Sequence, residues 1–381
     1  SHGHALCTAY NRAGTLLAVG CNDGRLVVWD FQVRAIVRLL IGHVKAITSV
    51  DWSREGRHLV SAATDWTVLL WDAVRAVVVR KISFQSPVLG AWLHPSLSYI
   101  LARPYMESPC LVTLGDDDRT TRQPLPVLLG VDQPADPKKL RVHSMACALE
   151  KNHDKVYAGN GRGVLAVYTI PSLEVERSCE VPGGVGVKAL CFSSSGRFLL
   201  ANCVDRSIKL YASQDLEYLR EFKDPVQHLQ WKAFSFSSDE EYVMAGVAER
   251  ALHNIYLWTR DGGRLEKRLE GPPEGVMDLQ WHPHEPFIVS CSTFGTIYIW
   301  AVKKTENWSA FAPDFETLPE NVPYIELEGE FDDQEDSLDS GAADTIQEPA
   351  DNEDVVIEDD SDAESSTSKG VWYLPPHEDL L

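Results

Sequence analysis

The chain has 381 residues, of which 56 are acidic and 35 are basic, and its formal net charge is −21 at pH 7. It contains no apolar run of about 18 residues, which excludes a readable transmembrane helix. No charged segment leads into an apolar one, which excludes a readable signal peptide. We therefore expect a protein without a membrane partner.

The charge is concentrated in the last fifth of the chain. Residues 1–304 hold 34 basic and 32 acidic side chains, whereas residues 305–381 hold 24 acidic side chains and one lysine. Such an acidic segment buries too little apolar surface to offset its ordering entropy, and its like charges repel each other. The sequence therefore predicts a nearly neutral folded body and a tail that orders on a partner.

The eight cysteines are scattered along the chain without a C-x-x-C pair. Several stand in apolar runs such as 188–192, where a reduced thiol that fills the core is the expected role. We therefore expect free cysteines and an intracellular protein, without a disulfide or zinc framework.

An internal repeat of about 42 residues begins near the start of the chain. Trp29-Asp30 recurs 42 residues later as Trp71-Asp72, and Trp258 and Trp300 have the same spacing. Within each unit, short β-branched runs are separated by turn dipeptides, which is the pattern of four short strands. The pattern resembles the WD40 repeat, in which each unit forms one blade of a β-propeller.

Seven units can be counted, and they predict an all-β, seven-bladed WD40 β-propeller over residues 1–304. The third unit is the least regular, with a long segment at 124–137, and the seventh has no obvious fourth strand. In this fold the missing strand usually comes from the N-terminus, and this chain begins without Met and too late to supply it. We therefore expect a trimmed or partly disordered N-terminus. The units begin near Ala5, Ala46, Val88, Val142, Val187, Gln227 and Val276.

One unit carries the complete set of polar residues that WD40 blades use as a hydrogen-bonded tetrad. His43, Ser61, Asp65 and Trp71 match that tetrad in the second unit, and the other units match it only in part. The resemblance implies a structural role for these four residues.

No catalytic motif is present in the sequence. G-x-S-x-G, H-E-x-x-H and G-x-x-x-x-G-K-[ST] are all missing. The glycines of 159–163 lie between two predicted strands and suit a hairpin turn, and His2 and His4 have no further metal ligands nearby in sequence. We therefore predict a protein that is not an enzyme and that takes no cofactor, metal or small-molecule substrate.

The last fifth of the chain divides into three predicted segments. Residues 305–325 contain the aromatic and proline-rich run 306–315, which we expect to pack on the propeller and to lead into an activating segment. Residues 326–369 form an acidic, largely extended partner-binding tail, and residues 370–381 form a C-terminal segment that folds back on the propeller.

The whole chain resembles one family more specifically than WD40 repeats alone would allow. The matching stretches are 16–25 in the first unit, the Trp-Ser-Ala-Phe-Ala-Pro-Asp-Phe run at 308–315, the adjoining acidic run 326–333 and the stretch 372–375. They are similar to the retinoblastoma-binding WD-repeat subunits of COMPASS- and MLL-type histone methyltransferase complexes. The resemblance implies a non-catalytic nuclear scaffold that supports methylation of lysine 4 on histone H3.

The resemblance also implies three binding segments in the tail. The first lies along the SET domain of the methyltransferase, the second meets basic side chains of an Ash2-type SPRY subunit, and the third docks into a second WD-repeat propeller subunit. The first segment contains Tyr324, Ile325, Leu327 and Phe331. The second contains Glu330, Asp332, Asp333, Glu335 and Asp336. The third contains Glu353, Asp354, Val355, Val356 and Ile357.

A histone-modifying complex must also approach DNA, where arginine and lysine neutralise phosphates. Arg206 and Lys209 in the fifth unit and Arg250 in the sixth are the candidate nucleosome contacts. The alternative from another class is a WD-repeat substrate receptor of a ubiquitin ligase, which would recruit its targets through one face of the propeller.

Overall fold

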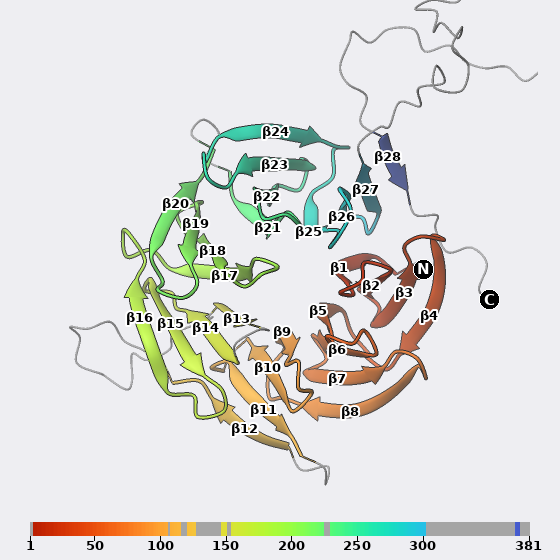
Figure 1. Cartoon of the computed structure of the whole chain (residues 1–381). Coiled ribbons are helices and arrows are strands. Elements are labelled where there is room, and N and C mark those ends of the chain that lie inside the picture. The colour runs from red at the N-terminus through yellow and green to blue at the C-terminus, as the bar shows by residue number, and fades with distance from the viewer. Residues whose placement is uncertain are drawn as a thin grey trace, which may run out of the picture. The chain divides into compact units, whose positions relative to one another are not determined.

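The computed structural model describes residues 3–105, 107–115, 120–126, 146–150, 154–224, 229–301 and 370–373. Its strands form seven antiparallel sheets of four strands each, numbered here one to seven in chain order. The sheets form a ring, with the first strand of each sheet innermost and the fourth outermost (Figure 1). This arrangement confirms the predicted seven-bladed WD40 β-propeller.

The strands of the first four sheets are short and regular. Sheet one contains β1 (Ala5–Tyr10), β2 (Leu16–Cys21), β3 (Arg25–Asp30) and β4 (Ala35–Ile41). Sheet two contains β5 (Ile47–Trp52), β6 (His58–Ala63), β7 (Thr67–Asp72) and β8 (Val77–Ser83). Sheet three contains β9 (Val88–Leu93), β10 (Tyr99–Pro104), β11 (Cys110–Leu114) and β12 (Thr120–Pro124). Sheet four contains β13 (Ala146–Glu150), β14 (Lys155–Gly159), β15 (Val164–Thr169) and β16 (Val175–Glu180).

The last three sheets repeat the same order. Sheet five contains β17 (Val187–Phe192), β18 (Phe198–Cys203), β19 (Ile208–Ala212) and β20 (Tyr218–Phe222). Sheet six contains β21 (Trp231–Phe236), β22 (Tyr242–Val247), β23 (Asn254–Thr259) and β24 (Leu265–Glu270). Sheet seven contains β25 (Val276–Trp281), β26 (Ile288–Ser292), β27 (Ile297–Ala301) and β28 (Gly370–Tyr373).

Most sequence-predicted unit starts coincide with the innermost strands. Five of them fall within one residue of the first residue of β1, β5, β9, β17 and β25. The fourth and sixth units begin about four residues later than expected, at Ala146 and Trp231. At these two places a long connection precedes the innermost strand. Turn residues in the sequence do not show where such a connection ends and the strand begins.

The fourth strand of the seventh sheet comes from the C-terminal part of the chain. β28 pairs antiparallel with β27, so that Gly370 lies opposite Ala301 and Tyr373 opposite Tyr298. The expectation that an N-terminal strand would fill this position is therefore wrong. The inference of a trimmed N-terminus loses its support, because it rested on that missing strand.

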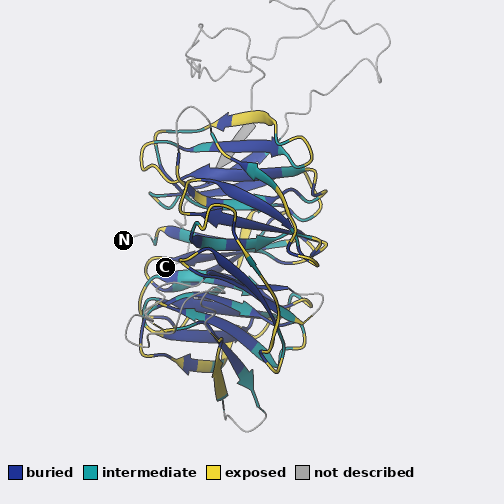
Figure 2. Cartoon of the chain, turned by 90° about the vertical axis from the view of Figure 1, so that its left-hand side faces the viewer, coloured by how far each residue is buried: buried dark blue, intermediate teal, exposed yellow. Residues whose placement is uncertain are grey.

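Burial is greatest in the middle strands of each sheet, intermediate in the innermost strands and least in the outermost ones, and Figure 2 colours the chain by burial. Every residue of β7 is buried, because the middle strands are covered on both faces by neighbouring sheets. The outer strand β24 instead reads Leu-Glu-Lys-Arg-Leu-Glu and is exposed at five of six positions. The near-continuous apolar runs of the sequence therefore mark the middle strands, and the charged runs mark the rim.

The core is a series of apolar clusters, each of which joins two neighbouring sheets. Trp52 of sheet two is buried, and its indole Nε1 donates a hydrogen bond to the carbonyl of Ala9 in sheet one at 3.0 Å. In the same way, Trp231 of sheet six donates to the carbonyl of Arg206 in sheet five at 2.9 Å. Each tryptophan thus fixes the distance between two sheets as well as filling the space between them.

The predicted tetrad of the second unit is formed. The Ser61 hydroxyl lies 2.7 Å from Nε2 of His43 and accepts a hydrogen bond from Trp71 Nε1 at 2.8 Å. Nδ1 of His43 lies 2.9 Å from Asp65 Oδ2. Burial lowers the pKa of His43, although the Asp65 carboxylate acts in the opposite direction. The four residues tie the loop before β5 to the two middle strands of sheet two.

A second network of this kind was not visible in the sequence. His253 Nε2 lies 2.7 Å from the hydroxyl of Ser290, which accepts a hydrogen bond from Trp300 Nε1 at 2.8 Å. Among the described residues, Nδ1 of His253 has no hydrogen-bond partner, so the aspartate of the tetrad has no counterpart here. Sequence comparison missed the network because His253 comes from the connection between β22 and β23 of sheet six, 37 residues before Ser290, whereas the tetrad histidine precedes its serine by 18 residues.

The eight cysteines are all free, as expected, and six of them are buried. Burial raises the pKa of Cys147 and of Cys203 to about 12, so both remain thiols at neutral pH. No helix in the described part of the chain is long and apolar enough to cross a membrane.

Candidate interaction surface

The predicted tail segments lie outside the described residues, so their binding roles remain predictions. This applies to Tyr324, Ile325, Leu327, Glu330, Phe331, Asp332, Asp333, Glu335, Asp336, Glu353, Asp354, Val355, Val356 and Ile357. The three predicted nucleosome contacts, by contrast, lie in sheets five and six.

Arg206 lies in the tight turn between β18 and β19. Asp205 shapes this turn, because its Oδ1 accepts hydrogen bonds from the backbone N and the hydroxyl of Ser207 at 3.1 and 2.6 Å. Burial acts to raise the pKa of Asp205, but these hydrogen bonds outweigh it and the pKa is lowered. Arg206 follows with a positive φ of 69°, and its side chain is exposed. The turn therefore presents Arg206 at the surface.

Lys209 is placed differently from the sequence-based expectation. It is only 3% exposed, and its Nζ donates a hydrogen bond to the carbonyl of Pro182 at 2.6 Å. The same ammonium lies 3.3 Å from Asp205 Oδ2. Because it is buried and already paired, Lys209 cannot reach a phosphate in this conformation, and we do not retain it as a nucleosome contact.

Arg250 lies in the connection between β22 and β23 and is exposed. Within the described part of the chain, its side chain takes part in no hydrogen bond or ion pair. Arg206 and Arg250 thus occupy equivalent connections of two neighbouring sheets. Since the connection between the second and third strands lies at the same end of every sheet, both arginines belong to one face of the ring, where they can pair with phosphate oxygens.

The same face carries exposed apolar side chains that the sequence analysis did not single out. Trp66, Val204 and Phe294 stand in the turns between second and third strands of sheets two, five and seven, and all three are about half exposed or more. The three residues stand on sheets that are not neighbours in the ring, so they are separate apolar side chains on this face and do not form one patch. This face of the ring therefore carries both cationic and apolar exposed side chains.

No group of three or more histidine, cysteine, aspartate or glutamate side chains suited to a metal ion occurs among the described residues. His4 uses its Nδ1 to contact the carbonyl of Phe294. This contact ties the start of the chain to the seventh sheet.

The profile of the "WD domain, G-beta repeat" matches residues 1–30, 34–72, 177–212 and 263–301. The solved β-propeller domain of Myceliophteria thermophila Cps50 (Swd1) superposes with a TM-score of 0.73 and is 33% identical, covering 80% of this chain and 98% of that one. The fold and its repeats thus define a WD-repeat β-propeller protein.

Two comparisons that span most of the chain identify the family. The "Retinoblastoma-binding protein 5 homolog" of Drosophila melanogaster is 36% identical over 89% of this chain and 69% of its own length. The "Set1 complex component swd1" of Schizosaccharomyces pombe is 36% identical over 87% of this chain and 84% of its own. The chain belongs to the family of retinoblastoma-binding protein 5 and Swd1.

Proposed function

We propose that this protein is a non-catalytic scaffold and activating subunit of a nuclear histone H3 lysine-4 methyltransferase complex. Membership of the retinoblastoma-binding protein 5 and Swd1 family, over most of the chain, carries this proposal. The Schizosaccharomyces pombe relative is named as a Set1 complex component, which indicates a chromatin assembly as the setting.

In this proposal the acidic tail supplies three separate contacts. Tyr324 to Phe331 lie along the SET domain, the acidic residues between Glu330 and Asp336 meet the SPRY subunit, and Val355 to Ile357 dock into the second WD-repeat subunit. An extended peptide gains affinity from backbone hydrogen bonds and specificity from alternate side chains in pockets. In this proposal the tail thus connects the three partners.

Linked binding explains why such a tail needs several segments. A segment that folds on binding loses several kcal/mol to ordering, so each contact alone is modest. Once one segment is bound, the others bind at a high effective concentration set by the connecting chain. The complex would therefore assemble through the sum of three contacts and weaken strongly when one is removed.

The face of the ring that carries Arg206 and Arg250 is our candidate for nucleosome engagement. Two exposed guanidinium groups on neighbouring sheets support contact with DNA phosphates. Replacing both arginines with glutamine should lower nucleosome affinity and reduce its dependence on salt.

Co-purification tests the assembly itself. The tagged chain, isolated from nuclei and analysed by mass spectrometry, should recover a SET-domain methyltransferase, an Ash2-type subunit and a second WD-repeat protein. Recovery of cullin and adaptor subunits in their place would instead support a substrate receptor of a ubiquitin ligase.

Charge reversal tests the second tail contact. Changing Glu330, Asp332 and Asp333 to lysine should weaken binding to the SPRY subunit, because close interfacial charge pairs are worth about 1.5–7 kcal/mol. The wild-type interaction should also weaken as ionic strength rises. A dissociation constant that stays the same from low to high salt would count against this assignment.

A further inference from the structure

A row of equivalent turns surrounds the axis of the ring at the end opposite Arg206 and Arg250. Each turn joins the first strand of a sheet to its second strand. In the first sheet Asn11 Oδ1 accepts a hydrogen bond from Leu16 N at 3.0 Å, and in the second Ser53 Oγ accepts one from His58 N at 3.0 Å. The fifth sheet repeats the arrangement with Ser193. These turns therefore share one geometry.

The fourth residue of the turns in sheets one, two and five is glycine. Gly14 and Gly56 have φ values of 75° and 71°, which favour glycine, and their backbone N–H groups bond back to the first residue of the turn at 3.0 Å. This closed turn leaves its second residue free to project. The second residue is Arg12 in sheet one and Arg54 in sheet two.

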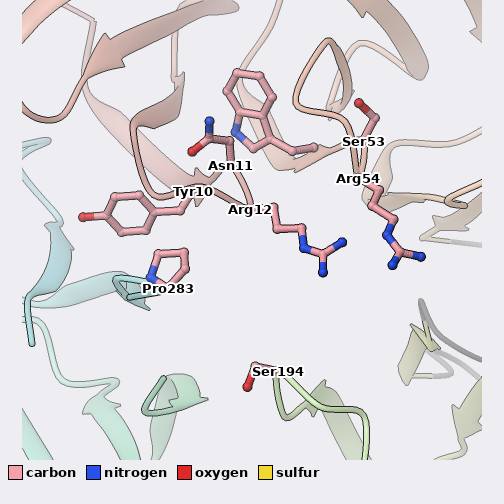
Figure 3. A pocket seen from close by; sticks show the side chains of 8 residues that line it. Tyr10, Asn11, Arg12, Ser53, Arg54, Ser194 and Pro283 are labelled. Carbon is pink, nitrogen blue, oxygen red and sulfur yellow. The ribbon is translucent and has the colours of Figure 1, made fainter. Parts of the chain in front are cut away.

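Residues at this second position from four sheets line a single pocket with a volume of about 270 Å³ (Figure 3). Arg12 and Arg54 extend from adjacent turns into the same space, Ser194 lies across from them, and Pro283 completes the set. The pocket therefore arises from the repeated turn. Its two positive charges come from the arginines at the second turn position in sheets one and two.

The two guanidinium groups have no partner in the described part of the chain. Both arginines are exposed, and neither side chain makes a hydrogen bond or ion pair there; the neighbouring acid Glu55 pairs with neither. Arg57, at the end of the same turn as Arg54, behaves differently and binds Asp72 at 2.9 Å. Two unpaired cations at one pocket create a positive potential that attracts an anionic ligand.

The nearby carboxylate of Glu240 is paired with Arg197, whose Nη2 lies 3.6 Å from Glu240 Oε2, and not with the two pocket arginines. Its Oε1 accepts hydrogen bonds from Ser195 N at 2.6 Å and from the Ser194 hydroxyl at 3.0 Å, and the side chain is almost fully buried. Glu240 is thus held by the turn of sheet five. The Ser194 hydroxyl is likewise occupied and is not available as a donor to a ligand.

We propose that this arginine pocket, defined by Arg12 and Arg54, binds an acidic peptide through two carboxylates, one for each guanidinium. The planar fork of arginine matches the two oxygens of a carboxylate. Phosphate sites usually add a nest of backbone N–H groups, but the glycine N–H groups of these turns are already used within the turns. Side-chain carboxylates of a partner protein therefore fit the donors that are present.

The test uses the full chain and a fluorescein-labelled peptide containing alternating glutamate and serine. A peptide with glutamine at every glutamate, a phosphoserine peptide and a short DNA duplex serve as the other ligands, and binding is followed by anisotropy. The acidic peptide should bind about tenfold or more tightly than its glutamine counterpart. R12Q and R54Q should each remove most of that preference.

Two further variants separate the pocket from general electrostatics. R162Q removes the same charge from the exposed turn between β14 and β15, at the other end of the ring, and should leave peptide affinity within about twofold. R54K keeps the charge but loses the fork, and should bind less tightly than wild type. Unchanged thermal melting of all variants checks folding.

Three results would overturn the proposal. The first is equal affinity for the acidic and glutamine peptides, and the second is an R162Q loss as large as that of R54Q. The third is tighter binding of the phosphoserine peptide or of DNA through the same two arginines, because the ligand group would then be a phosphate and not a carboxylate.

Discussion

The Asp278 side chain in β25 accepts hydrogen bonds from both the backbone N and the hydroxyl of Thr8 in β1, at 2.6 and 3.1 Å. These two residues join the last sheet to the first, so the contact lies at the place where the ring closes. At the equivalent position between sheets two and three, the backbone N of Ala91 donates a hydrogen bond to the Ser49 hydroxyl at 3.4 Å. The closing contact thus uses a carboxylate where an internal one uses a hydroxyl.

Removing this carboxylate should destabilise the whole ring. Asp278→Ala leaves the Thr8 N–H without its acceptor, and we expect the free energy of unfolding to fall by about 1–3 kcal/mol. Ser49→Ala is the matched control at the equivalent contact, and should cost less because its hydrogen bonds are long. Urea unfolding followed by tryptophan fluorescence measures both. Equal midpoints for Asp278→Ala and wild type would refute the role of this contact in closure.

Ser61 is the hub of the tetrad in sheet two, since its hydroxyl bonds to both His43 and Trp71. Ser61→Ala should therefore leave two buried polar groups unpaired and lower stability by about 2–4 kcal/mol. Ser290→Ala should give a similar loss, because Ser290 makes the same two bonds to His253 and Trp300. The exposed Ser172 serves as the control, with an expected change within about 0.5 kcal/mol on replacement by alanine. A loss at Ser61 no larger than that at Ser172 would show that the tetrad is not structural.

His253 should make stability depend on pH. Burial lowers the pKa of His253 to about 4, whereas a histidine in the unfolded chain has a pKa of about 6.5. Between these values the unfolded chain binds a proton that the folded chain does not, so stability is present above about pH 6.5 and is lost as the pH falls toward 4. The loss from this residue amounts to about 3 kcal/mol.

The comparison of wild type with His253→Gln isolates this effect. Urea unfolding at pH 7.5 and pH 4.5 should show a smaller pH-dependent loss in the variant than in wild type. An identical pH dependence in both proteins would mean that His253 does not titrate as its burial implies.

The repeat made the ring predictable, because turn glycines and closing aromatics recur at fixed spacing and each unit must bury its faces against a neighbour. The pairing of β28 with β27 was not predicted, although residues 370–381 were expected to fold back on the propeller, because a long segment without repeat signals separates the two strands in sequence. A short apolar run such as 370–373 could have been matched to that vacant edge.

The surface residues show why site prediction from sequence is harder. Arg206 and Lys209 are three residues apart and equally basic, yet one is exposed and the other is buried against Pro182. Burial of a lysine depends on a carbonyl and a carboxylate that the fold brings to it, which no local pattern reports. Arg12 and Arg54 each stand two residues before a glycine in the sequence, but only the ring brings them into one pocket.

The third tail contact gives a prediction for binding. If Val355, Val356 and Ile357 dock into the second WD-repeat subunit, replacing all three with alanine should remove about 1.5–3 kcal/mol for each fully buried side chain. Even partial burial should lower affinity by about tenfold or more. Calorimetry of wild-type and triple-alanine tail peptides measures this, and binding to the SPRY subunit should be unchanged because it uses a separate acidic segment. A triple variant that binds the second propeller as tightly as wild type would place the docking motif elsewhere.

In the proposed function, this chain activates a methyltransferase without being one. The direct measurement is the rate of methyl transfer to a histone H3 peptide by a SET-domain enzyme and an Ash2-type subunit, with and without the purified full chain. The chain alone should show no transfer, and its addition should raise the rate of the other two. A rate that does not change when the chain is added, or transfer by the chain alone, would contradict the account.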